Sequence, residues 1–321
     1  MHIRNIPGRK SDISDATWIA DLLAHGLIRG SVVPPPLVQA LRDLTRTRKQ
    51  LVREIAQHTL RIQKILETAN VKLTGVLTDI LGVSGRAILR ALIAGETDPV
   101  RLAELTRGPI KASRAALAAA LQGHVTADHR FLLQLHLTQI QALEATVGEV
   151  EARLGEELVP YRVALDHLVT MPGISETAAR VIVAEIGFDM DRFPTAGHLV
   201  SWAGLCPRLH ESAGKRLSNR VRRGNPWLKT TLVQAAWAAA RKRDGYFHAQ
   251  FLRIKSRRGP KKAILAVAAS MLTAAHHMLK HNVDYRDLGA DHFDRRDKAQ
   301  LARRLVRRLH DLGLEVNVPI A

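Results

Sequence analysis

The chain has 321 residues, and its 48 lysines and arginines against 30 aspartates and glutamates give a formal net charge of +18 and a pI near 10.8. Its single cysteine, Cys206, excludes a disulfide framework and a cysteine-based zinc site. A chain this basic most often binds nucleic acid. It lacks a signal-peptide pattern, and its longest apolar run, residues 263–275, is short and alanine-rich. We therefore predict a cytoplasmic protein.

Residues 1–35 contain a basic turn, a predicted short helix over residues 16–25 and a run of three prolines from position 34. Asp12 and Asp15 stand three residues apart at a helix start, so both carboxylates can lie on one face and share a divalent metal ion. An N-capping aspartate with an acidic first turn explains the spacing equally well.

Two heptad patterns mark residues 36–158. The first runs from Leu37 to Ala69 in alternating steps of four and three, and eight of its ten positions are apolar. The second runs from Leu133 to Leu154, and glycines and prolines between the two punctuate shorter helices. This pattern predicts an antiparallel coiled-coil arm with a helical insert, and the arm offers a surface for a homo-oligomer.

The last segment, residues 159–321, begins with a pattern that resembles a helix-hairpin-helix. Pro172, Gly173 and Ile174 match its turn, and Ser175 stands where a second glycine is usual. Free amides in such a turn face a DNA phosphate, so Pro172, Gly173 and Ser175 are candidate nucleic-acid contacts. An ordinary helix-turn-helix corner with a capping serine fits the same residues.

Residues 204–228 place Ser212 in a small-residue turn, S-A-G-K, surrounded by cations. A hydroxyl that attacks a phosphodiester needs an exposed position and cations that neutralise the developing charge. Ser212 is therefore a candidate nucleophile; the alternative is that it caps a turn while the cations grip a DNA backbone. Between positions 208 and 262 the chain has 16 lysines and arginines but two acids. The candidate nucleic-acid contacts are Arg208, Lys215, Arg216, Arg220, Arg222, Arg223, Arg257, Arg258, Lys261 and Lys262.

Two alanine-rich helices are predicted after this segment, over residues 230–241 and 263–280, and a basic connector over residues 253–262 joins them. In the tail, residues 295–312, leucines recur on one helical face while arginines lie largely off it.

Together these segments resemble bacterial insertion-sequence transposases of the group numbered 110, with relatives 116 and 902. The motifs that carry the resemblance are P-G-R-K-S-D-I-S-D-A near the start, then M-P-G-I-S, S-W-A-G-L, E-S-A-G-K and R-R-G-N-P between residues 171 and 226. The resemblance implies a mainly α chain in three parts: the end of a resolvase-like domain of ribonuclease-H fold (1–35), the coiled-coil arm (36–158) and a helical transposase domain (159–321).

The same resemblance implies that Ser212 is the nucleophile that joins a DNA end. It also implies that Asp12 and Asp15 are the last two of four acidic residues that bind Mg²⁺, and that an element-encoded structured RNA is a partner besides DNA. The other two acids should precede this block on strands, for which eleven residues are too few. We therefore expect an N-terminally truncated transposase, inactive alone. The alternatives are a non-catalytic helix-hairpin-helix DNA-binding protein and a coiled-coil interaction protein.

Overall fold

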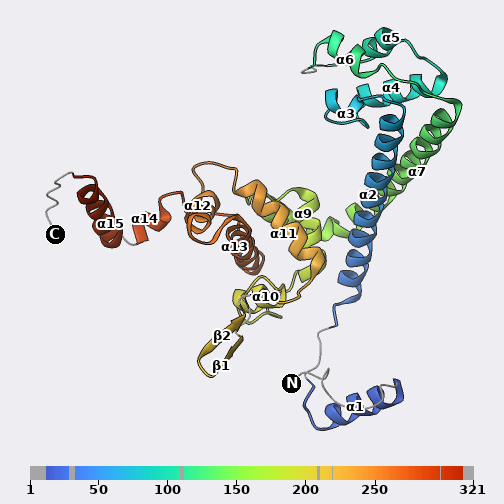
Figure 1. Cartoon of the computed structure of the whole chain (residues 1–321). Helices are drawn as coiled ribbons and strands as arrows, with labels where there is room; N and C mark the ends of the chain where they lie inside the picture. The colour runs from blue at the N-terminus through green and yellow to red at the C-terminus, as the bar shows by residue number, and fades with distance from the viewer. Residues whose placement is uncertain are drawn as a thin grey trace. The chain divides into compact units, whose positions relative to one another are not determined.

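The computed structural model is mainly helical, as the sequence predicts (Figure 1). The chain divides into two compact units, residues 1–36 and 37–321. The structure describes residues 12–28, 33–108, 112–207, 210–218, 220–296 and 298–313.

The described part of the first unit contains one helix, α1 (Asp12–Ala24), which starts earlier than predicted, with Asp12 and Asp15 in its first turn. Carboxylates there interact favourably with the helix dipole, which accounts for the earlier start. None of its residues is buried; Ile13, Ile19 and Leu23 are exposed.

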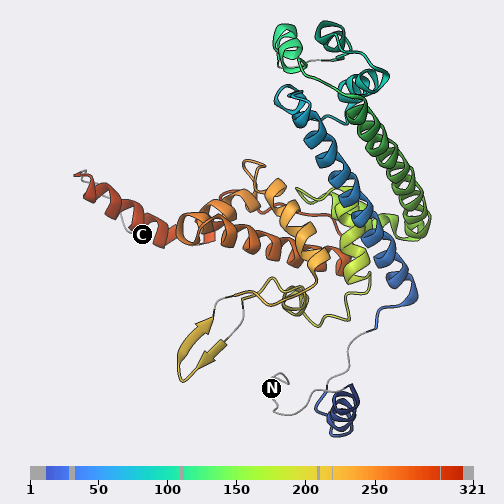
Figure 2. The same ribbon diagram turned by 45° about the vertical axis from the view of Figure 1, so that its right-hand side comes forward.

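Two long helices, α2 (Pro36–Thr68) and α7 (Ala127–Leu158), run side by side in both views of the ribbon (Figure 2). The apolar seam positions Ile62, Leu133 and Ile140 are buried in one core within the chain. These three positions are therefore covered within the chain, whereas other seam positions, such as Leu51 and Val147, are only half-buried.

Two polar seam positions of α2 find polar partners on α7. Arg48 donates a 2.7 Å hydrogen bond from Nε to Oε1 of Glu151, and the Nδ1 atoms of His58 and His136 lie 3.2 Å apart. Polar pairs inside an apolar seam disfavour other registers, because a shifted helix would bury them without partners.

Four helices form the described part of the insert between α2 and α7. Two of them begin with a side-chain cap, because Asp98 and Ser113 accept hydrogen bonds from backbone amides, and Thr126 forms a capping box with His129 at the start of α7. The insert comprises α3 (Leu73–Val76), α4 (Val83–Ala94), α5 (Pro99–Glu104) and α6 (Arg114–Ala120).

The main core lies among the helices that follow the arm, and it includes Leu41 of α2 and Leu154 and Leu158 of α7. The base of the arm is thus part of this core. The remaining helices are η2 (Val159–Tyr161), α8 (Arg162–Val169), α9 (Glu176–Ile186), α10 (Ala196–Trp202), α11 (Pro226–Ala239), α12 (Tyr246–Arg258), α13 (Pro260–His281), α14 (His292–Arg296) and α15 (Lys298–Asp311).

The helix α13 is long and apolar enough to cross a membrane, which the alanine-rich run within it did not suggest from sequence. Half of its most apolar window is buried inside the structure. Val267, Met271 and Leu272 have no exposed surface, so α13 is a core helix of this unit.

The prediction of a basic connector over residues 253–262 is wrong, because all of these residues except Gly259 belong to α12 or α13. Phe247 and Phe251 lie one turn apart and are buried, and this apolar pair fixes α12 on the core up to Arg258. Gly259, with φ +79°, is the single residue between α12 and α13.

Candidate nucleic-acid interface

The segment with Ser212 forms a β-hairpin, of β1 (His210–Ser212) and β2 (Lys215–Ser218). Ser212 pairs with Lys215 across the turn, and the two turn residues, Ala213 and Gly214, have φ of +49° and +70°. A two-residue turn with both φ values positive matches the right-handed twist of a hairpin. Ser212 is thus the last strand residue before the tip, with Lys215 opposite it.

The positive φ of Ala213 costs conformational energy, whereas the positive φ of Gly214 does not. A residue with a Cβ in the left-handed region is disfavoured by roughly 1–2 kcal/mol. The hairpin register, which aligns Ser212 with Lys215, stabilises this conformation locally.

Two glycines form the neck of this loop. Gly204, at the end of α10, lies so close to Gly224 that a Cβ on Gly204 would be 2.7 Å from the Gly224 nitrogen; a Cβ on Gly224 would lie 2.2 Å from the carbonyl oxygen of Ala203. Lys229 donates a 3.2 Å hydrogen bond to the Gly204 carbonyl. The chain therefore leaves the core and returns to it at one point.

The predicted cations of this loop are distributed along it. Lys215 and Arg216 are residues of β2, and Arg208 lies outside the described residues. Arg220, Arg222 and Arg223 are exposed on the return segment. No ion pair within 4.0 Å joins these three arginines to an acid in the described part of the chain, so they are available to an anion.

The predicted helix-hairpin-helix consists of α8 and α9, and its turn packs on α11. Gly173, with φ +86°, approaches so closely that a Cβ would lie 2.3 Å from the carbonyl oxygen of Ala235. Ser175 accepts a hydrogen bond from the amide of Ala178 and caps α9. Pro172 is half-buried. Both glycine and serine thus have structural roles, and their contact with nucleic acid stays a prediction.

An acid stands at the start of α9. Glu176 accepts hydrogen bonds from Arg162 at 3.0 Å and from Arg180 at 2.8 Å. The bond from Arg180 holds the pKa of Glu176 below its usual value. A phosphate at this helix start would be repelled by the carboxylate of Glu176. Arg162 and Arg180 would have to offset that repulsion for any anion to bind there.

A buried carboxylate that the sequence did not predict lies beside Asn225, close to the end of the serine loop. Glu185 of α9 has no exposed side-chain surface and accepts two 2.9 Å hydrogen bonds from Arg46 of α2. Arg42 and the amide nitrogen of Asn225 also contact the same carboxylate. Asn225 caps α11 with its other side-chain atom, at 2.9 Å from the Trp227 amide. The sequence carries a signal for this site, because a glutamate within the apolar stretch of residues 182–186 needs polar partners when it is buried.

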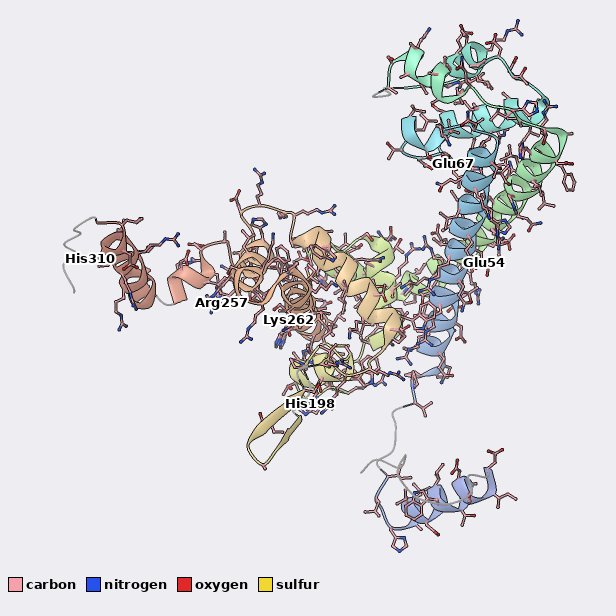
Figure 3. The ribbon with its side chains drawn as sticks, in the orientation of Figure 1. Glu54, Glu67, His198, Arg257, Lys262 and His310 are labelled. Atoms are coloured by element: carbon pink, nitrogen blue, oxygen red, sulfur yellow. The ribbon has the colours of Figure 1, made fainter. Side chains whose placement is uncertain are left out.

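The remaining predicted cations surround the junction of α12 and α13. Arg257 and Arg258 end α12, Lys261 and Lys262 lie in the first turn of α13, and all four are exposed. Figure 3 labels Arg257 and Lys262 on the two sides of this junction. Cations in the last turn of α12 suit the helix dipole, but those in the first turn of α13 oppose it. This unfavourable placement is what a bound anion would relieve.

Asp12 and Asp15 are exposed in the first turn of α1. Across the described residues, no group of three or more His, Cys, Asp or Glu side chains is placed to hold a metal ion, and residues 1–11 contain neither Asp nor Glu. Because Mg²⁺ requires octahedral coordination, two carboxylates on one turn fall short of a site. These residues alone do not fit the ion.

Comparisons with known proteins identify two matching segments. Residues 165–252 match the family model described as "Transposase IS116/IS110/IS902 family", and residues 1–71 match a DEDD transposase model of the IS110 type. The second match implies a metal-dependent active site in general terms.

Curated relatives agree with these matches. The chain is 26% identical to a probable family 20 transposase of Pseudomonas aeruginosa over 74% of its own length and 61% of the relative's. A putative transposase of Sinorhizobium fredii is 28% identical over 75% and 58%, respectively. A pilin gene-inverting protein of Moraxella lacunata is 30% identical over 38% of each chain. The chain thus spans about three fifths of the length of the two transposases.

Proposed function

We propose that this chain is a transposase of the IS116/IS110/IS902 group, that it binds DNA, and that it carries the serine that cuts and joins the strands; its two family matches support the proposal. The observation that supports this most directly is the hairpin of Ser212 and Lys215, at the tip of a loop rich in cations. DNA binding is the common requirement of transposases.

In the proposed reaction the Ser212 hydroxyl attacks the phosphorus of a phosphodiester. A serine–phosphate bond forms, one bridging P–O bond breaks, and the leaving oxygen takes up a proton. Lys215 and Arg223, with Arg208, are the candidate cations that neutralise the negative charge on the phosphate as the bond forms. A second strand end that attacks the serine–phosphate bond would release Ser212 and complete the exchange.

Asp12 and Asp15 would contribute two oxygen ligands to a Mg²⁺ site that needs further carboxylates. When bound, the ion would lower the charge on the reacting phosphate. We therefore propose that strand exchange by this chain requires acidic groups supplied from outside its own 321 residues.

The test uses Ser212→Ala with Ser218→Ala as the matched control, since both serines lie in the same hairpin. The assay adds a protein segment that supplies the further carboxylates, together with DNA of a cognate element and its transcript. Ser212→Ala should abolish the covalent protein–DNA product and retain DNA binding, whereas Ser218→Ala should retain both the product and DNA binding. A covalent product with Ser212→Ala would reject the assignment.

A second candidate function, DNA binding without catalysis, is favoured by the absence of a complete metal cluster from the described residues. It predicts salt-sensitive DNA binding but no covalent product under any condition. A structured RNA as second partner, a homo-oligomer and a cytoplasmic location complete the proposal.

A further inference from the structure

A row of cations on the arm helix α2 meets one aromatic ring at the start of α11. Lys49 Nζ and Arg53 Cζ each lie 5.4 Å from the centroid of the Trp227 ring, and Arg46 Cζ lies 5.7 Å from it. Positions 46, 49 and 53 recur at helical spacing, so the three side chains share one face of α2. Three cations beside one ring are more than cation–π attraction requires.

The charges in this row are not balanced. The buried carboxylate in reach is Glu185, which is already bonded to Arg42, Arg46 and Asn225. Lys49 and Arg53 form no ion pair within 4.0 Å in the part of the chain that the structure describes. Burial first, and then the neighbouring Arg53, hold the pKa of Lys49 below its usual value. Lys49 is half-buried and Arg53 is exposed, so this excess positive charge lies where a polyanion can reach it.

Trp227, beside which these cations lie, is close in sequence to the end of the serine loop. Trp227 follows the exposed Arg222 and Arg223 by five and four residues, and the neck glycine Gly224 lies between them and the helix. Cations of α2 and cations of the loop thus converge at the start of α11. An extended polyanion would contact both, whereas a small anion would contact one.

We propose that Lys49 and Arg53, beside Trp227, form a contact for the phosphate backbone of a nucleic acid that continues to the loop of Ser212. The proposal rests on the proposed function and adds a surface of the arm base to it. Phosphates offset the mutual repulsion of the cations, and each contact releases counterions. DNA and structured RNA share this chemistry, and the experiment separates them.

The test compares Lys49→Gln/Arg53→Gln with Arg61→Gln/Lys64→Gln in the 321-residue chain. The control pair removes the same charge from exposed positions of the same helix, at least eight residues beyond Arg53 along α2. Fluorescence anisotropy with a labelled 30-base-pair duplex or a structured RNA, over a range of salt concentrations, gives each affinity and its salt dependence. Circular dichroism checks that both variants fold.

For duplex DNA, the Lys49/Arg53 variant should bind at least fivefold more weakly, and its slope of log K against log salt should be smaller by about 1.8, which corresponds to two phosphates. The control should match the unmodified chain, and Lys49→Arg/Arg53→Lys should restore binding. A loss confined to the RNA would identify RNA as the ligand of this surface, and a loss confined to DNA would identify DNA.

Equal affinity and equal salt slope of both double variants, for both ligands, would overturn this surface while leaving DNA binding by the chain intact. Absence of salt-sensitive binding by the unmodified chain would reject the proposed function and this surface together. If the double variant does not fold, Lys49→Gln alone should reduce the slope by about 0.9.

Discussion

The guanidinium of Arg46 donates two hydrogen bonds, each 2.9 Å long, to the buried carboxylate of Glu185, 139 positions later in the chain. This paired geometry is the strong form of an arginine–carboxylate contact. It joins the base of the arm to α9, and Asn225 extends the contact to the start of α11. The orientation of the arm base is therefore coupled to the segment that begins directly after the serine loop.

Replacement of Glu185 by alanine should destabilise the protein. Two arginines would lose their carboxylate, and Asn225 would lose an acceptor. We expect a loss of about 3 kcal/mol in the free energy of unfolding, at the low end for a buried pair because Arg42 and Arg46 keep some access to water. Denaturation by urea measures it. Glu54→Gln, at an exposed position of α2, should change stability by less than about 0.5 kcal/mol; an equal loss in both variants would contradict the role of Glu185.

The neck of the serine loop predicts a second effect. Gly224→Ala would place a methyl group 2.2 Å from the Ala203 carbonyl oxygen, so the two chain segments would have to separate. The variant should lose the covalent DNA product that Ser212 is proposed to form. In Gly148→Ala, where no atom lies within 4 Å of the added carbon, stability should be unchanged or rise by about 1 kcal/mol. Full activity of Gly224→Ala would show that the neck does not position the loop.

The seam of the arm predicts a third. Ile62 has no exposed surface, and Ile62→Ala should cost about 2–4 kcal/mol through the cavity it leaves. Val52, on the same helix, is 42% exposed, so Val52→Ala should cost much less free energy of unfolding. Light scattering on both folded variants should give the same mass as the unmodified chain, because Ile62 is covered within the chain. A mass that halves in Ile62→Ala alone would contradict this.

The histidine pair in the arm predicts a dependence on pH. Burial chiefly, with His58 and Arg61, holds the pKa of His136 below its ordinary value of 6.5. The unfolded chain then binds a proton that the folded chain does not, so stability is full above about pH 6.5 and falls as the pH decreases toward the folded-state pKa. Thermal melts between pH 7.5 and 5 measure this. His136→Gln should flatten the profile partly, since the pKa of His276 is lowered by burial as well; an unchanged slope would reject the assignment.

The acidic pair of α1 predicts the fifth result. In Mg²⁺ the 321-residue chain alone should bind DNA without joining strands, because Asp12 and Asp15 supply too few ligands to hold the ion in place. A recombination assay with a cognate element's DNA and transcript measures joining. Robust joining, lost again on treatment with a chelator, would show that this chain completes a metal site from its own residues.

Much of the fold could be predicted because its pattern is periodic. The seams of α2 and α7 repeat over many turns, and Ile62, Leu133 and Ile140 bury as expected, while several other apolar seam positions are half-buried. The alanine-rich helices could also be predicted, but α12 could not, since its basic composition masks the buried pair Phe247 and Phe251.

The candidate site was predictable where it lies in one stretch of sequence. The S-A-G-K turn is local, and its backbone is a hairpin turn because Gly214 and Ala213 adopt positive φ. The contacts of Glu185 with Arg46, and of Trp227 with Lys49 and Arg53, join residues more than 130 positions apart. Composition and spacing carry no information on which distant side chains meet.

The contact of Gly204 with Gly224 also bears on how the protein can change. Leu205 and Cys206 still pack in the main core, but the seventeen residues 207–223 are inserted at a single point of the fold, between helices that meet without them. Selection can therefore change the length or the net charge of this insertion without changing how the adjoining helices pack. The close approach of the two glycines would let the segment with the proposed nucleophile be exchanged as a unit, and a replacement segment from a relative needs only the same two end points.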